Sequence, residues 1–175
     1  MTTLPDILRG FRPAGEELLR ITQCVTEPYA AVDPRHLDVE VAAGGAARLV
    51  VLHTSPELSA LRCTLGEGAR LELTELFTAE AFAEVAVVQA ARSDCRITTV
   101  QLASANAAYR IDLNGRGAEN TLGGVFLAAD EEHCVVRLHT AHNVSDCRSE
   151  SCVKGVAGGR AVGAVSYTHL RANET

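Results

Sequence analysis

The chain has 175 residues and a formal net charge of −6, and it is 47% hydrophobic but only 4% aromatic, with no Trp. It is therefore long enough for one domain, or one domain with a small appendage, whose core consists of Val, Leu, Ala and Ile. The negative charge provides no basic surface for nucleic acid, and no window approaches the ~20 apolar residues of a membrane-spanning helix.

The start of the chain and its cysteines indicate the cellular compartment of the protein. Residues 1–6 lack the basic region and the apolar run of a secretory signal. The six cysteines are spaced irregularly and do not form a compact disulfide framework. We therefore expect free thiols and a cytoplasmic protein.

Residues 1–45 are interpreted as an N-terminal helical and loop segment. Within residues 4–21 acidic residues come early and Arg20 comes late, which suits the dipole of a short helix. Leu8 and Phe11 belong to an apolar stripe that is expected to pack onto the body of the protein. Pro and Gly residues divide the rest of this segment into loops and brief strands.

From residue 46 onward the sequence predicts short strands separated by turn residues. The predicted strands cover residues 49–53, 60–65, 70–73, 85–88 and 96–102. They recur about every 11 to 16 residues, as in a sandwich, a barrel or a solenoid. Few connections contain a hairpin turn, and small aliphatic side chains fit stacked coils. Both observations favour a solenoid, whereas the periodicity alone leaves the three architectures open.

Residues 107–113 show the alternation of a strand with one buried face. Ala107, Tyr109, Ile111 and Leu113 fall on one face, and the residues between them fall on the other. The pair that follows, Asn-Gly at 114–115, tolerates positive φ and predicts a tight turn. A further strand is predicted over 122–127, where two adjacent glycines indicate a bend or a close backbone approach.

The run Leu-Asn-Gly-x-Gly-Ala-x-x-x-Leu at residues 113–122 resembles the core of the SufB/SufD family, the scaffold proteins of the SUF iron–sulfur assembly system. The same residue types as in the family follow at His133, His142, Cys147, Ser149, Lys154, Ala161 and Gly163. The resemblance extends over residues 69–165 and is closer to SufD than to SufB. It implies an all-β core over residues 46–165, wound as a right-handed parallel β-helix that is incomplete at its C-terminal end.

Residues 166–175 are interpreted as a non-native tail on a truncated SufD-like chain. This stretch shows no kinship to the family, which would continue with further coils, and we expect no strand in it. Its composition is that of translated adapter or junction sequence. Tyr167 and His169 are therefore left out of any functional argument.

The resemblance also implies a function and partners. The protein is expected to be a scaffold and not an enzyme, with SufB-like and SufC-like partners and with the ATPase activity residing in SufC. No cofactor is expected to bind this chain stably, and an iron–sulfur cluster would be present only transiently in the full complex. The unpaired edge of the last coil could also support an edge-to-edge homodimer.

Soft and borderline metal ligands gather in one stretch of the chain, at His133, Cys134, His139, His142, Cys147 and Cys152. Their spacing argues against a closed preformed site, since there is no Cys-x-x-Cys pair. Cys134 and Cys152 are expected to pack in the core. His142 and Cys147 remain the candidates for contact with iron or sulfide, because both match the family pattern.

Two other functions stay open at this point. One is a β-helix domain that acts on carbohydrate, which the low aromatic content disfavours. The other is a metal-binding domain that uses His142 and Cys147. A cysteine protease lacks its motif, and the Gly-x-Gly at 115–117 lacks the rest of a phosphate-binding loop.

Overall fold

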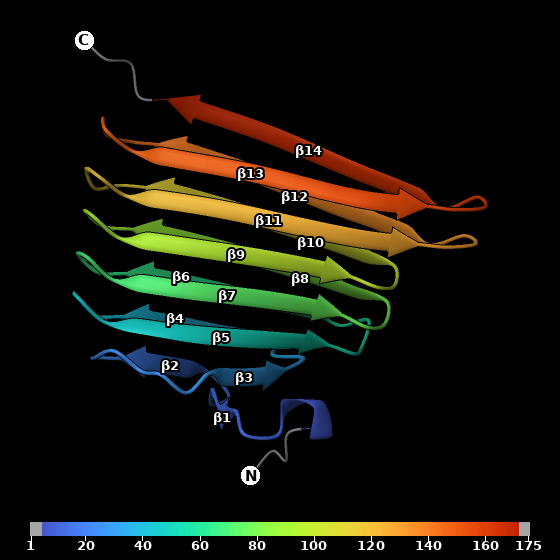
Figure 1. Ribbon diagram of the computed structural model, residues 1–175, viewed down its shortest axis with the longest axis horizontal. Coiled ribbons are helices and arrows are strands. Elements are labelled where there is room, and N and C mark those ends of the chain that lie inside the picture. The colour runs from blue at the N-terminus through green and yellow to red at the C-terminus, as the bar shows by residue number, and fades with distance from the viewer. Residues whose placement is uncertain (1–4, 172–175) are drawn as a thin grey trace.

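The computed structural model describes residues 5–171, which form two parallel seven-stranded sheets (Figure 1). The odd sheet contains, in spatial order, β1 (Arg12–Pro13), β3 (Tyr29–Val32), β5 (Ala46–His53), β7 (Arg70–Phe77), β9 (Asp94–Gln101), β11 (Glu119–Ala128) and β13 (Arg148–Ala157). The even sheet contains β2 (Leu18–Ile21), β4 (His36–Val41), β6 (Leu58–Leu65), β8 (Ala81–Gln89), β10 (Ala105–Leu113), β12 (His133–His142) and β14 (Val162–Arg171).

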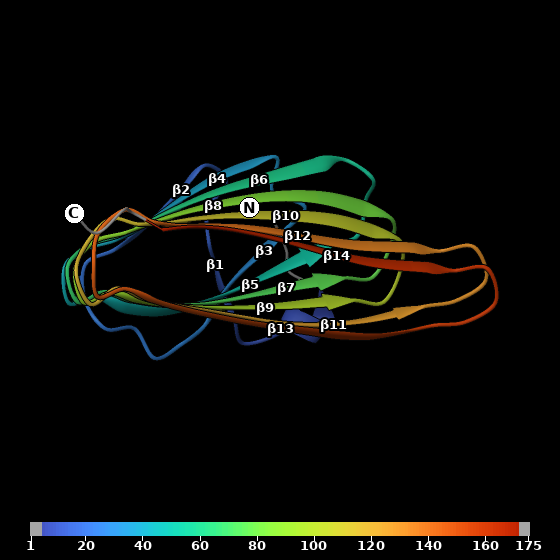
Figure 2. The ribbon, with the colours of Figure 1, turned by 90° about the horizontal axis from the view of Figure 1, so that it is seen from above.

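Each coil of the chain contributes one strand to each sheet, which makes the fold a parallel β-helix with a flattened cross-section (Figure 2). In Figure 1 the near strands run to the right, the far strands return to the left, and the chain rises from N to C, so the winding is right-handed. The register advances 24 residues from Leu49 to Leu73 and 29 residues from Leu122 to Ser151. The fold expected from the family resemblance is confirmed.

The core lies between the two sheets and is built from stacked columns of aliphatic side chains. Leu49, Leu73, Ile97 and Leu122 occupy equivalent positions in successive coils, and each is at most 1% exposed. Full burial of such a side chain stabilises the fold by about 1.5–3 kcal/mol. The buried face predicted for residues 107–113 is confirmed.

The turn predicted after residue 113 is present, but its glycines have different roles from those expected. The residue with positive φ is Gly117, at 71°, and not the Asn114–Gly115 pair. Gly115 is needed for close packing, because a Cβ atom there would lie 2.0 Å from the backbone nitrogen of Ala91 in the preceding coil. The turn therefore packs directly on the turn of the coil before it.

The prediction of a helix within residues 4–21 is wrong for the residues that the structure describes. Only a single 3-10 turn, η1 (Asp6–Leu8), is helical, and β1 and β2 follow it. Leu8 and Phe11 do pack onto the body, where they contact the outer face of the odd sheet at Leu52 and Leu76. The N-terminal residues therefore start the two sheets and cover part of one face.

The expectation that no strand occurs in residues 166–175 is also wrong, because β14 extends to Arg171. The open edge of β12 supplies a complete backbone ladder, and β14 pairs with it from His133↔Val162 to His142↔Arg171. All the side chains of β14 are exposed, so backbone pairing contributes most of its attachment. Within the described residues, no helix is long and apolar enough to cross a membrane.

Candidate functional site

The candidate site lies at the last coil, where the interior of the β-helix opens. Two of its inward-facing positions on β13 carry serines, Ser149 and Ser151, where the coil before has Asn120 and Leu122. The column Leu49, Leu73, Ile97 and Leu122 ends at the exposed Ser151. A small cavity of about 80 Å³ lies beside it, lined in part by Asn120, Thr140, Ser149, Ser151 and His169.

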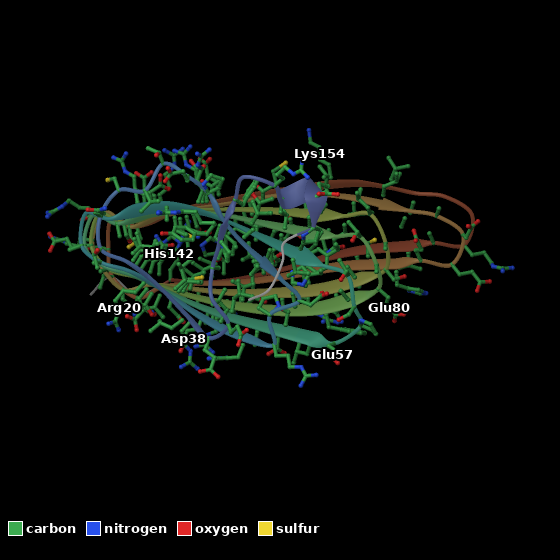
Figure 3. All side chains as sticks on the ribbon, turned by 90° about the horizontal axis from the view of Figure 1, so that it is seen from below. Arg20, Asp38, Glu57, Glu80, His142 and Lys154 are labelled. Atoms are coloured by element: carbon green, nitrogen blue, oxygen red, sulfur yellow. The ribbon has the colours of Figure 1, made fainter. Side chains whose placement is uncertain are left out.

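His142 occupies the end of β12 and points between the two sheets, as Figure 3 shows. Its Nε2 atom lies 2.9 Å from Ser149 Oγ and 2.9 Å from His169 Nε2. Burial lowers the pKa of His142, and the adjacent His169 and Arg171 act in the same direction. A neutral imidazole with an available nitrogen lone pair is the form that binds a metal ion.

Cys147 lies in the turn between β12 and β13 and is half-buried against the core. Its thiol donates to the carbonyl oxygen of Gly115 at 3.3 Å. Burial raises the pKa of the Cys147 thiol, a backbone hydrogen bond at Ala118 opposes this, and the Asp146 charge reinforces it. The thiol is therefore protonated at neutral pH and is not an activated nucleophile.

The remaining predicted ligands are spread over different surfaces. Cys134 is buried and donates to Ala103 O at 3.3 Å, which confirms its place in the core. His133 and His139 lie on the opposite face of β12 from Cys134. The prediction that Cys152 packs in the core is wrong: it is exposed, because it lies on the outer face of β13, in register with Gly123 and Thr98. Among residues 5–171, no group of three or more His, Cys, Asp or Glu side chains could hold a metal ion.

Sequence reasoning missed a polar network in the middle of the core. Glu75 is fully buried, with one carboxylate oxygen 3.1 Å from His53 Nε2 and the other accepting a hydrogen bond from the Tyr109 hydroxyl at 2.5 Å. The alternation of β7 indicates that Glu75 is buried, because this residue follows Leu71 and Leu73 on the buried face of the strand. Its partners could not be identified, because they are 22 and 34 residues away along the chain.

A second polar network lies nearer the open end. Gln89 donates from Nε2 to the carbonyl oxygen of Glu119 at 2.8 Å, and its Oε1 accepts from Asn120 Nδ2 at 3.2 Å. Both side chains are buried, so these hydrogen bonds satisfy groups that would be costly to leave unpaired. They bind β8 to β11 across the interior, and Gln89 lies two coils before His142 in the same column.

The geometry of the fold and of the site indicates a class of protein. It is a parallel β-helix whose last coil in the described residues carries His142, Ser149 and Ser151 on its inner side. Such an arrangement is suited to holding and assembling other components.

The comparison with protein families identifies the class further. The family model described as SUF system FeS cluster assembly, SufBD core domain, matches residues 25–166, and the chain belongs to this family. No individual curated protein matches the chain. The family is an assembly component of the SUF iron–sulfur system, works in a complex with other proteins, and is not a classical enzyme.

Proposed function

We propose that this protein is a SufD-like scaffold that pairs with a SufB-like protein and works with a SufC-like ATPase in the cytoplasm. The observation that carries the proposal is the match of residues 25–166 to the SufBD core domain, on a parallel β-helix whose strands can pair with those of another sheet. Within residues 5–171, β13 is hydrogen-bonded only to β11, and β14 only to β12. β13 is ten residues long and lies wholly before residue 166, so its sheet offers a long row of backbone groups.

An unpaired edge of this kind is a ready template for another sheet. Apolar side chains accompany the backbone groups on the inward faces: Val165 is 37% exposed, and Val153 is only partly buried. A partner β-helix that continues the coil stack would satisfy the edge and cover these side chains. A second copy of the same chain could bind in the same way, which gives an edge-to-edge homodimer.

The iron–sulfur cluster enters this proposal as the substrate that the complex assembles. His142 lies at the open end and is held by Ser149, so it is suited to face a cluster formed at the seam with a partner. Cys147 would act only after deprotonation or a shift of its turn, since its thiol is protonated and half-buried. The alternative of carbohydrate chemistry has no support in the groove of about 510 Å³ on the outer face of the even sheet, whose lining includes a single carboxylate, Glu84.

The test is co-purification of the chain with a SufB-like partner after substitution at the edge. Ser151→Lys places a charge at an inward-facing position of the last coil, where it opposes stacking of a partner but contacts no following coil of its own. We expect partner capture to fall by about tenfold or more, because an unpaired charge would be buried at the seam. Thr121→Lys is the matched control, because Thr121 is exposed on the outer face of β11.

Equal capture by the two variants would rule out pairing through the end of the coil stack. A wild-type chain that is monomeric at all concentrations and captures no SufB-like partner would refute the SufD-like assignment. Circular dichroism of both variants shows whether the fold is retained.

A further inference from the structure

The outer face of the odd sheet carries a continuous band of aliphatic side chains near the C-terminal ends of its strands. Its main column runs in register through four coils, as Leu52, Leu76, Val100 and Val125. On the outer faces of β9, β11 and β13 the charged side chains come earlier in each strand, except for Lys154. The upper part of the band, here called the aliphatic stripe, consists of Val100, Leu102, Val125, Leu127 and Val156.

The lower part of the same band is already covered by the chain itself. Leu8, the last residue of the η1 turn, packs with Phe11 against Leu52 and Leu76. Seen along the coil axis, Lys154 projects on the same side of the odd sheet as the η1 turn, so the turn and the stripe lie on one line along the stack (Figure 3). The structure therefore shows which element this band accepts: a helical turn together with an apolar residue three positions further on.

This cover changes the exposure of side chains that occupy equivalent positions. Leu52, beneath the N-terminal segment, is 5% exposed, whereas Val125, three coils later in the same column, is 50% exposed. Val125 has a paired strand on either side, so the end of the sheet does not cause its exposure. Leu102, Leu127 and Val156 are between 51% and 65% exposed. A contiguous group of exposed aliphatic side chains is typical of a surface that binds another protein.

We propose that the aliphatic stripe docks an amphipathic helical segment of a partner protein. A helix that lies on an open sheet face buries its own apolar side and that of the sheet, which is how sheets and helices form layers. The partner's apolar side chains, three and four residues apart, would meet the stripe as Leu8 and Phe11 meet the lower part of the band. From β9 to β13 the stripe spans two strand spacings, about 10 Å, which about seven helical residues cover.

Other occupants fit the stripe less well. Within residues 5–171 the one helical turn is η1, and it is already packed on its own sheet, so these residues of a second copy offer no free helical segment. A membrane surface is disfavoured because interfacial binding draws on several basic residues, and Lys154 is the one basic residue within the band on β9, β11 and β13.

The docking surface does not rest on the proposed assembly function. Pairing at the edge of β13 extends the odd sheet and leaves its outer face open. The probe is a fluorescein-labelled amphipathic peptide of about 14 residues, with Leu along one helical face and polar residues elsewhere. Its binding to the full chain is measured by fluorescence anisotropy. A peptide of the same composition, with Leu distributed around the helix, is the peptide control.

The tested variant is Val125→Thr with Leu127→Thr, which removes apolar surface from the stripe and keeps residues that are favourable in a strand. The matched control is Leu58→Thr with Val88→Thr, which makes the same two substitutions on the outer face of the even sheet. Circular dichroism of both variants shows whether the fold is retained.

We expect saturable binding of the amphipathic peptide that weakens about tenfold in the stripe variant and less than about twofold in the control. Equal binding by the two variants, equal binding of the two peptides, or no saturable binding to the wild-type chain would overturn the proposal. A concentration-dependent dimer that only the stripe variant loses would assign the stripe to a second copy instead. Binding to vesicles of phosphatidylcholine and phosphatidylserine, lost in the same variant, would assign it to a membrane surface.

Discussion

At the residue scale, the most informative feature is the buried carboxylate of Glu75 between His53 and Tyr109. A charged or polar group in an apolar core is stabilised only when its hydrogen bonds are satisfied. His53 also stacks on Phe77, with ring centroids 4.2 Å apart, so the aromatic ring holds the imidazole against the carboxylate. The network joins β5, β7 and β10 and thus ties three coils and both sheets to one register.

The contribution of this network can be measured with Tyr109→Phe. The substitution keeps the ring and removes the donor to Glu75, which leaves a buried carboxylate oxygen unpaired. We expect the free energy of unfolding in urea to fall by about 2 kcal/mol. Tyr29→Phe is the control, because the Tyr29 hydroxyl forms no hydrogen bond in the described chain, and its expected change is below about 0.5 kcal/mol. Equal losses for the two variants would show that the network adds no stability.

Two buried thiols predict how stability depends on pH. Burial raises the pKa of Cys63 to about 12, and it raises the pKa of Cys95 as well. In the unfolded chain both thiols ionise near pH 8.5. Between that pH and about 12 the unfolded state therefore binds fewer protons than the native state, and stability falls as pH rises. Burial also raises the pKa of Tyr109, reinforced by Glu75, which adds to the loss above about pH 10.

Urea unfolding from pH 8 to pH 10 tests this linkage. The wild-type chain is expected to lose up to about 1.4 kcal/mol per pH unit for each thiol. Cys63→Ala with Cys95→Ala lowers stability at every pH but flattens the slope, whereas Cys24→Ala, at an exposed thiol, keeps the wild-type slope. A double variant with an unchanged slope would mean that the buried thiols do not control the alkaline loss.

At the element scale, the turns determine how closely successive coils stack. Gly115 is the tightest case, since a Cβ atom would overlap the backbone of Ala91 and not a side chain that could move. We expect Gly115→Ala to cost several kcal/mol or to prevent soluble expression, because a shift of the turn propagates to the adjoining strands. Gly123→Ala is the control: nothing lies within 4 Å of its Cβ position, and alanine in a strand is favourable by about 0.5–1 kcal/mol. Chemical denaturation of the two variants gives the comparison, and similar stabilities would contradict close turn stacking.

The success of sequence reasoning also differs from element to element. Strand β10 was predicted with the correct buried face because its alternation is unbroken. Strands β1 and β2 were missed, and β3 and β4 were predicted only as brief strands without bounds, because these strands are two to six residues long and Pro and Gly interrupt the segment, which hides a period of two. Strand β14 was missed because backbone pairing with β12 does not depend on side-chain pattern.

The candidate site was predictable only in part for the same physical reason. His142 and Cys147 could be selected from the family pattern, but the contact of His142 with Ser149 depends on how β12 and β13 face each other across the interior. The polar lining of the last coil depends on register between coils, which a single sequence does not reveal.

At the scale of the whole molecule, the proposed assembly function belongs to the end of the coil stack, where His142 lies. Metal analysis of protein purified anaerobically, alone and with its SufB-like partner, tests the proposed place of His142. We expect iron and sulfide to be retained only by the complex, and His142→Ala to reduce that retention several-fold, because a ligand at the seam is lost. His36→Ala, on the outer face, is the control.

Other metal contents would separate the remaining interpretations. Zinc alone, bound by the isolated chain and lost in His142→Ala, would favour a metal-binding domain. Iron retained equally by the wild-type chain and the His142→Ala variant would remove His142 from the assembly site. If the complex retains neither metal, the result favours a scaffold that acts through protein contacts only.

The parallel coil stack has a consequence for how the protein comes to be folded. Each strand pairs with the equivalent strand of the coil before it, so a newly made coil needs only its predecessor as a template. Because the ribosome releases the N-terminal coils first, winding can keep pace with translation. At every moment a single growth front is then exposed, and the segments most prone to aggregate are covered almost as soon as they are made.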